Sequence, residues 1–462
     1  MSRKIVIETA ITFVFMFIIA TTSSAATYFY VDADAGQNGD GSLFSPWDHP
    51  NELENNRAAI TAAAAYGPVV VYLDRQDRWT FTGDDRLFLA SYGTSWLNSI
   101  TYDGLSWTGD TQATGQDRAE IVIDGSDNIG VWIQNGVEYN SGLGTTYDAY
   151  VKVYGFDING SDKTDTCAPL QANNASHIFI ENCIVHNAGN AKATSPGIRF
   201  ATHARGTTGL TITDLNVKNC TIYKTSTHGI AFYPIDSDNV GDIRVEGCTI
   251  SDFGSNYAAA AGIQVMSADS GTIRGNTIHD SATKDAGAGI KLEHRHSPPS
   301  HFLIESNYIY GSSGNETHHG IELTAAIDII IKDNRLLNLS GYGIFIYDSP
   351  LGYGSCSEIR LFNNKIYNTT GHAIANANST GTISELSENI IKQSSNSRAV
   401  HNTGTITEHS SNVMCNRVST WGAVWQDNKI TTYAEIKEWE STASNTCPPP
   451  SLTQMIPLLL HQ

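Results

Sequence analysis

Residues 289–323 read GIKLEHRHSPPSHFLIESNYIYGSSGNETHHGIEL, a segment that begins and ends with the same short motif. The motif is Gly, Ile, a variable residue and an apolar residue, written G-I-x-h below. Between its two copies lies an apolar run that ends in Asn and is followed by x-I. The same order recurs along the chain at intervals of 25 to 37 residues. The Asn or Cys positions of successive units are Cys183, Cys220, Cys248, Asn276, Asn307, Asn334, Asn364 and Asn389.

The recurring unit predicts the fold. Copies of G-I-x-h read GIRF, GIAF, GIQV, GIKL, GIEL and GIFI, followed by the weaker AIAN and AVHN. Units this short, with two or three strands each and no 3.6-residue apolar period, are typical of coils of a parallel β-helix. Strands of neighbouring coils then pair about 4.8 Å apart, and like residues stack in the interior. Cys183, Cys220 and Cys248 are expected there as small buried residues.

The ends of the repeat set the domain boundaries. Residues 51–67, NELENNRAAITAAAAYG, carry the one strong helix pattern and are expected to cap the N-terminal end. We assign residues 26–412 to the β-helix with this cap, 413–447 to a C-terminal cap, and 448–462 to a linker-like tail. Cys415 and Cys447 flank the last segment and are the candidate disulfide among seven cysteines.

The first residues indicate export. A basic start, an apolar stretch and a run of small residues give residues 1–25 the pattern of a secretory signal peptide. No later segment is long enough to span a membrane. The expected location is therefore secreted, periplasmic or at the cell surface, and a monomer is expected. The formal charge of −19 argues against nucleic acid as a partner.

Alternation along the G-I-x-h strands predicts which side chains face outward. The Ile and the final apolar residue point inward, so the x residue and the residue two beyond it share one outer face. The predicted first column is Arg199, Ala231, Gln264, Lys291, Glu322 and Phe345, and the second is Ala201, Tyr233, Met266, Glu293, Thr324 and Tyr347. His228, His319, Tyr342 and His372 enter these strands. Ionisable groups gather near Lys291, as expected of a strip along which a sugar chain lies.

The opening YFYVDADAGQNGDGSLFSPWDHP, together with the G-I-x-h and N-x-I coil, resembles secreted right-handed parallel β-helix enzymes that act on carbohydrates. They include alginate, chondroitin and pectate lyases, mannuronan epimerases and some glycoside hydrolases. The resemblance implies an all-β, right-handed parallel β-helix, a polysaccharide substrate, and an active site on the outward sheet or beside it. It also implies Ca²⁺ as the cofactor of the lyases. The metal ligands are unknown, and the acidic stretch DADAGQNGDG is more typical of a turn.

The favoured chemistry is β-elimination on a uronic-acid glycan. That reaction needs a cation for the substrate carboxylate, a base for the α-proton and an acid for the leaving oxygen. We assign Lys291 as base or charge neutraliser, Arg295 and Arg199 as carboxylate binders, and His228 or His319 as the acid. Further substrate contacts are expected from Tyr233, Gln264, His294, Phe345 and Tyr347.

Two alternatives stay open. Glycoside hydrolysis would use Glu293 and Glu322 as its carboxylate pair, with Asp236, Asp238 and Asp348 in reserve. A non-catalytic glycan-binding or cell-surface β-helix is the second alternative, since charged residues on an exposed sheet are often only solvated. Epimerisation is disfavoured, because Ala231 stands where the epimerases carry a catalytic Asp.

Overall fold

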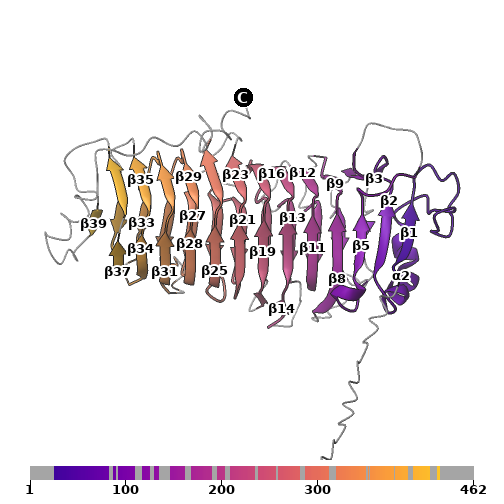
Figure 1. Cartoon of the computed structure of the whole chain (residues 1–462), viewed down its shortest axis with the longest axis horizontal. Helices are drawn as coiled ribbons and strands as arrows, with labels where there is room; N and C mark the ends of the chain where they lie inside the picture. The colour runs from indigo at the N-terminus through magenta and orange to yellow at the C-terminus, as the bar shows by residue number, and fades with distance from the viewer. Residues whose placement is uncertain are drawn as a thin grey trace, which may run out of the picture.

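Three long parallel sheets wind into one solenoid, seen from the side in Figure 1. The computed structural model describes residues 25–426 except 83–86, 90–91, 110–116, 125–129, 135–145, 162–167, 190–194, 203–208, 235–237, 256–258, 281–286, 312–318, 350–351, 353, 379, 394–398, 411 and 417–423. Each full coil passes through the first, second and third sheet in turn. The prediction of a right-handed parallel β-helix is confirmed, with three strands in each coil.

The first sheet contains β1 (Thr27–Val31), β2 (Val69–Leu73), β5 (Ile100–Asp103), β8 (Tyr147–Tyr154), β11 (Ala175–Glu181), β15 (Leu215–Lys218), β19 (Ile243–Glu246), β22 (Gly271–Arg274), β25 (Ser300–Glu305), β28 (Ile327–Lys332), β31 (Ser357–Phe362), β34 (Thr382–Ser387) and β37 (Thr405–Ser410). The second sheet contains β3 (Arg78–Thr82), β6 (Glu120–Asp124), β9 (Asp157–Asn159), β12 (Ile184–Ala188), β16 (Thr221–Thr225), β20 (Thr249–Phe253), β23 (Thr277–Asp280), β26 (Tyr308–Gly311), β29 (Arg335–Leu337), β32 (Lys365–Tyr367), β35 (Ile390–Gln393) and β38 (Val413–Asn416).

The third sheet contains the G-I-x-h strands. Its members are β4 (Leu87–Phe88), β7 (Val131–Ile133), β10 (Leu170–Asn173), β13 (Ile198–Ala201), β17 (Ile230–Tyr233), β21 (Ala261–Met266), β24 (Ala288–Glu293), β27 (His319–Thr324), β30 (Ile344–Tyr347), β33 (Ile374–Asn376), β36 (Val400–Asn402) and β39 (Val424–Gln426). A small outlying pair joins β14 (Thr211–Ile212) to β18 (Asn239–Val240).

Stacks of like residues fill the interior. The isoleucines of the G-I-x-h motifs, such as Ile263, Ile290 and Ile321, are fully buried. Phe200 and Phe232 stack in the same interior with ring centroids 4.9 Å apart. Cys183 and Cys220 are buried free thiols, as predicted. Because each coil buries its apolar side chains against the next, the core runs unbroken along the axis.

The turn between the first and second sheets carries a ladder of asparagines. The side-chain amide of Asn276 donates to the side-chain oxygen of Asn307 at 2.9 Å, and the contact repeats through Asn334, Asn364 and Asn389 to Asn412. These side chains are at most 5% exposed. Each also satisfies a backbone amide of the coil before it, so the ladder holds the register of the turns.

The first position of each G-I-x-h motif needs glycine because the backbone of the next coil leaves no space for a side chain. A Cβ placed on Gly262 would lie 2.7 Å from the carbonyl oxygen of Gly289, and a Cβ on Gly289 would lie 2.9 Å from that of Gly320. Backbones of successive coils approach closely at this corner, so a side chain has no room there. The corner fixes where each third-sheet strand begins, and hence which residues face out.

Both ends differ in detail from the sequence prediction. The cap over residues 51–67 consists of two short helices, α1 (Glu52–Asn55) and α2 (Arg57–Ala64), beside β1 and β2 (Figure 1). A 3₁₀ turn, η1 (Trp96–Asn98), follows. The boundary at 412 was wrong, because β38 pairs with β35 and β39 with β36, so the coils continue to residue 426. The expected disulfide, the tail and the signal peptide through residue 24 lie outside the described residues or side chains.

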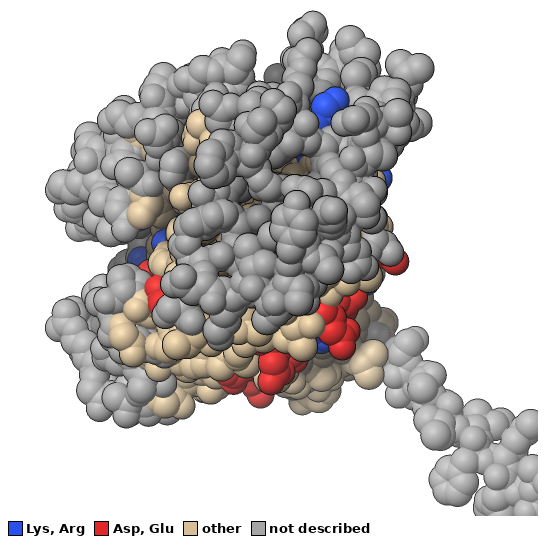
Figure 2. All heavy atoms as spheres, turned by 90° about the vertical axis from the view of Figure 1, so that its left-hand side faces the viewer, with Lys and Arg blue, Asp and Glu red and all other residues tan. Residues whose placement is uncertain are grey.

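Carboxylates are visible among the described residues at the C-terminal end of the molecule (Figure 2). Figure 2 shows more carboxylate than basic side chains among the described atoms of this end, as the charge of −19 leads one to expect. A search of the described residues finds no helix long and apolar enough to cross a membrane.

Candidate functional site

The third sheet arranges the predicted outward residues in register. Arg199, Ala231, Gln264, Lys291, Glu322 and Phe345 are direct partners on six successive strands, β13 to β30. The second column is also in register, with Glu293 opposite Met266 on one side and Thr324 on the other. The register therefore confirms the first column on all six strands and the second column from β21 to β30. Ala231, Gln264 and Thr324 of these columns are no more than 2% exposed.

Lys291 lies between two glutamates at the centre of this face. Its ammonium nitrogen is 3.2 Å from Oε1 of Glu322 and 3.4 Å from Oε2 of Glu293. The side chains of Lys291 and Glu322 are 11% and 8% exposed, while that of Glu293 is 33% exposed. Since both oxygens contact one nitrogen, they can be no further apart than the sum of these distances.

The surroundings keep Lys291 charged. Burial lowers the pKa of this lysine, but the carboxylates of Glu322 and Glu293 outweigh it, so the net pKa is raised above the ordinary value. A general base needs its proton removed near neutral pH. The base role assigned from the sequence therefore does not fit Lys291 in this structure, whereas a role as fixed cation does.

Both glutamates receive a second hydrogen bond. The Tyr347 hydroxyl donates to Oε1 of Glu322 at 2.7 Å. Nε2 of Gln264 donates to Oε2 of Glu293 at 2.9 Å. Burial and the Glu322 charge raise the pKa of Tyr347 to about 12, so it stays a neutral donor. Each carboxylate is thus held by an ammonium and a neutral donor from a neighbouring strand.

The two candidate histidines share one orientation. Nδ1 of His228 accepts the backbone N–H of Ala261 at 2.9 Å, and Nδ1 of His319 accepts that of Tyr342 at 3.0 Å. Burial and the Lys291 charge lower the pKa of His228 to about 3, so its imidazole is neutral at physiological pH. With Nδ1 accepting, the proton of the neutral ring sits on Nε2. His228 therefore offers a hydrogen-bond donor rather than an imidazolium acid.

Aromatic rings border the charged group on its C-terminal side. His319 stacks on Tyr342 with centroids 5.1 Å apart, and Tyr342 lies 4.7 Å from Phe345. Phe345 in turn stacks on Tyr347 at 4.7 Å. The predicted aromatic edge is therefore a continuous set of rings, the kind of surface on which a pyranose ring can lie.

The predicted cationic residues are not gathered around Lys291. Arg199 lies three coils away, about 14 Å by strand spacing, with its guanidinium 5.5 Å from the centroid of Tyr233. Arg295 follows the end of β24, is exposed, and reaches toward the sulfur of Met266. His294 is 6% exposed, and burial lowers its pKa. It follows the inward alternation of Ile290 and Leu292, a position that does not favour the substrate contact predicted for His294.

The reserve carboxylates lie elsewhere. Asp238 is 2% exposed and accepts the backbone N–H of Leu210 beside the small β14–β18 pair. Asp348 follows the end of β30. Asp236 lies outside the described residues. The Glu293 and Glu322 pair therefore remains the one that the strand register brings together.

The residues at Lys291 do not fit calcium. Ca²⁺ takes carboxylate oxygens as ligands, but Glu293 and Glu322 both face an ammonium. In the described part of the chain, three carboxylates close enough to share a cation occur at Asp32, Asp74 and Asp77, with ligand oxygens within 4.8 Å of one another. Asp32 directly follows β1, and Asp74 and Asp77 lie between β2 and β3, at the end of the solenoid away from β24 (Figure 1).

Comparison with known proteins agrees with the architecture. Residues 206–413 match the family model described as "Right handed beta helix region". A sequence search among curated proteins finds no match. The mannuronan C-5 epimerase AlgE4 A-module of Azotobacter vinelandii is similar in structure, with a TM-score of 0.54 and 14% identity over 86% of this chain and 100% of that one.

Two glycoside hydrolases are also similar in structure. The GH136 lacto-N-biosidase of Eubacterium ramulus gives a TM-score of 0.50 with 14% identity, covering 84% of this chain and 68% of that one. The catalytic unit of the GH87 α-1,3-glucanase of Streptomyces thermodiastaticus gives 0.50 with 15% identity, covering 86% and 70%. These similarities, the family match and the strand register identify the chain as a right-handed parallel β-helix protein.

Proposed function

We propose that this protein cleaves a polysaccharide by glycoside hydrolysis, with Glu293 and Glu322 as the catalytic pair. The observation that carries the proposal is the position of two glutamates on adjacent strands, both in contact with Lys291 at 3.4 and 3.2 Å. Paired carboxylates beside a sugar-binding surface are the machinery of most glycosidases. The expected signal peptide would make the reaction extracellular.

The separation of the pair favours retention of configuration. Retaining enzymes hold their carboxyl groups about 5–5.5 Å apart, and inverting enzymes about 6.5–9.5 Å apart. The shared contact with Lys291 brings one oxygen of each carboxylate close to the other, which supports a retaining arrangement as part of this proposal. Glu322 is fixed by Tyr347 and Lys291 and is assigned as the nucleophile on the anomeric carbon. Glu293, the more exposed of the two, gives its proton to the leaving oxygen and then deprotonates the attacking water.

Elimination, which the sequence favoured, is less well supported. A lyase must neutralise the uronate carboxylate next to the reacting carbon. Among the described residues, the cation at the centre is Lys291, and it already contacts two glutamates, so it is not free to neutralise a uronate carboxylate. With Glu293 protonated as the acid, the Glu322 carboxylate stabilises the positive, oxocarbenium-like transition state of hydrolysis.

The test is an activity assay on neutral and acidic polysaccharides that follows both possible products. Hydrolysis releases reducing ends without new near-ultraviolet absorbance, while elimination creates an absorbing C4–C5 double bond. Glu322→Gln and Glu293→Gln are each expected to lower kcat by about 100-fold or more. Glu305→Gln is the matched control, because Glu305 is ion-paired with Lys332 on the first sheet. Its activity should match the wild type.

Three outcomes would contradict the proposal. Ultraviolet-absorbing products would establish elimination in place of hydrolysis. Full activity in both glutamine variants would show that Glu293 and Glu322 are not the catalytic pair. Glycan binding without cleavage of any polysaccharide in the panel would favour the non-catalytic β-helix. The anomeric configuration of the first product, observed by NMR, tests retention separately.

A further inference from the structure

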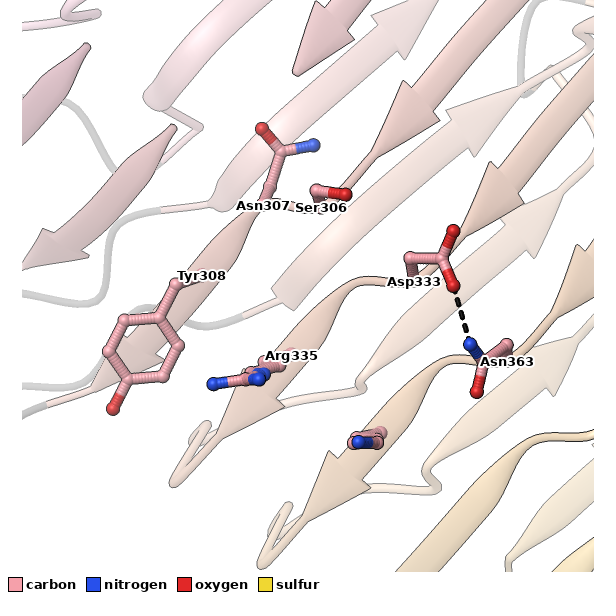
Figure 3. A pocket seen from close by; sticks show the side chains of 7 residues that line it. Ser306, Asn307, Tyr308, Asp333, Arg335 and Asn363 are labelled. Atoms are coloured by element: carbon pink, nitrogen blue, oxygen red, sulfur yellow. Dashed lines mark hydrogen bonds between the residues drawn. The ribbon is translucent and has the colours of Figure 1, made fainter. Parts of the chain in front are cut away.

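A second polar pocket lies on a different sheet from the Lys291 group. It has a volume of about 360 Å³ and opens on the second sheet, over β26, β29 and β32. Its lining residues are Ser306, Asn307, Tyr308, Asp333, Arg335, Asn363 and Lys365. In Figure 3 Tyr308 and Arg335 extend from neighbouring strands on the same side of the sheet. They are direct partners in the register, and Arg335 is in turn opposite Lys365.

Two cations of the pocket have no acidic partner. Within the described residues, Arg335 and Lys365 form no ion pair, whereas Lys332 and Arg360 nearby pair with Glu305 and Asp328. Asp333 is the one carboxylate in the lining, and it accepts a hydrogen bond from the side-chain amide of Asn363 (Figure 3). The pocket therefore carries net positive charge on a chain whose formal charge is −19.

The pocket also provides an aromatic wall and a polar atom. Tyr308 and Tyr310 lie with ring centroids 4.8 Å apart, and both rings are half-buried. The Tyr308 hydroxyl is buried and has no hydrogen-bond partner in the described structure. An unsatisfied buried hydroxyl is costly, so a ligand that bonds to it regains free energy. Half-exposed rings beside cations match the apolar face and the anionic group of a charged sugar.

We propose that the Tyr308–Arg335–Lys365 pocket binds negatively charged sugar units of an acidic polysaccharide. The two cations stand on adjacent coils, about 4.8 Å apart along the axis, a rise close to the length of one pyranose unit. Successive carboxylated or sulfated units of one chain can thus meet Arg335 and Lys365 in turn. The pocket is a binding site apart from the Glu293–Glu322 pair, and the proposal does not depend on what that pair does.

The experiment measures binding in a Glu322→Gln background, so that cleavage cannot interfere. Isothermal titration uses three probes: oligogalacturonate, a sulfated dextran, and neutral dextran of similar length. The double variant Arg335→Gln/Lys365→Gln is compared with Arg274→Gln/Arg360→Gln, which removes the same charge from ion-paired positions. The pocket variant should lose affinity for one or both anionic probes by about tenfold or more. The control variant should keep its affinity for the anionic probes. Neutral dextran should bind equally to the pocket variant and the control variant.

The anionic probe that binds identifies carboxylate or sulfate as the recognised group. Tyr308→Phe removes only the hydroxyl and should weaken binding of that probe by several-fold while the fold is unchanged by circular dichroism. The proposal is overturned if both double variants lose affinity equally, because the effect would then be general charge. It is also overturned if neither anionic probe binds, or if the pocket variant binds them as tightly as its parent.

Discussion

At the scale of single residues, Lys291 governs the candidate site. Removing its ammonium by Lys291→Met would leave two glutamates facing each other, one of them only 8% exposed. Breaking a buried ion pair costs about 3–5 kcal/mol, and the partial exposure of Glu293 favours the lower value. We expect a loss of about 3 kcal/mol in the free energy of unfolding, measured with urea. Arg244→Met, which removes an exposed pair with Asp242, should cost less than about 1 kcal/mol.

The difference in unfolding free energy between wild type and Lys291→Met should depend on pH as the raised pKa of Lys291 dictates. The pKa in the folded state is raised above that of the unfolded chain, so the stabilisation is complete below the unfolded value and is lost as pH rises through the folded one. The gap between wild type and Lys291→Met should therefore stay constant from neutral pH to about pH 9. A gap that closes across this range would contradict the assignment of a charged lysine.

The lowered pKa of His228 predicts a loss of stability at acid pH. Its folded pKa, about 3, lies below the ordinary value of 6.5, so the unfolded chain takes up a proton first as pH falls. Wild type should lose stability relative to His228→Gln below about pH 6.5, with a slope difference approaching about 1.4 kcal/mol per pH unit. Urea unfolding at several pH values checks this. Equal slopes for wild type and His228→Gln would contradict a neutral buried imidazole.

At the scale of the structural element, the asparagine ladder should behave as a linked unit. In Asn334→Ala the buried backbone amide of Asn307 loses its acceptor, and the buried side-chain amide loses one of two, keeping the Ile273 carbonyl. Each orphaned donor costs about 1–3 kcal/mol, so we expect a loss of about 3 kcal/mol in unfolding free energy. Cys248→Ala, at the same turn position before the ladder begins, should cost about 1 kcal/mol. Equal losses in the two variants would show that the amide contacts contribute nothing specific.

The strands and turns could be predicted from the sequence where the same motif recurs in each coil. The N-x-I and G-I-x-h periods gave the ladder and both outward columns of the third sheet, because parallel stacking turns a sequence interval into a spatial neighbour. His294 was predicted as a substrate contact although alternation with Lys291 and Glu293 gives it the inward parity of Leu292. The pairing of Lys291 with both glutamates depends on side-chain conformation, which periodicity does not contain. The second-sheet pocket was missed although a signal existed: Tyr308, Arg335 and Lys365 each directly follow a ladder asparagine.

At the scale of the whole molecule, the solenoid should tolerate loss of a complete coil. Deleting residues 221–248 joins Cys220 to Thr249, equivalent positions of two turns, and places β15 beside β22 in the same column. Because each coil contacts only its neighbours, β12, β13 and β15 can pair with β20, β21 and β22 in place of the deleted strands, while the outlying β14 loses its partner β18. Lys291, Glu293 and Glu322 are untouched, so the variant should be folded, unfold cooperatively and retain measurable cleavage.

Deleting only residues 221–234 provides the contrast. That change removes β16 and β17 but keeps β19, so one coil would lack its second and third strands and expose unpaired edges and core. We expect aggregation or loss of the cooperative transition, measured by size-exclusion chromatography and by circular dichroism during urea titration. If the half-coil deletion were as stable as the full-coil deletion, the coil would not be the unit that stabilises this fold. If the half-coil variant folded and the full-coil variant did not, stacking of coils in register would not explain how distant residues come together at the site.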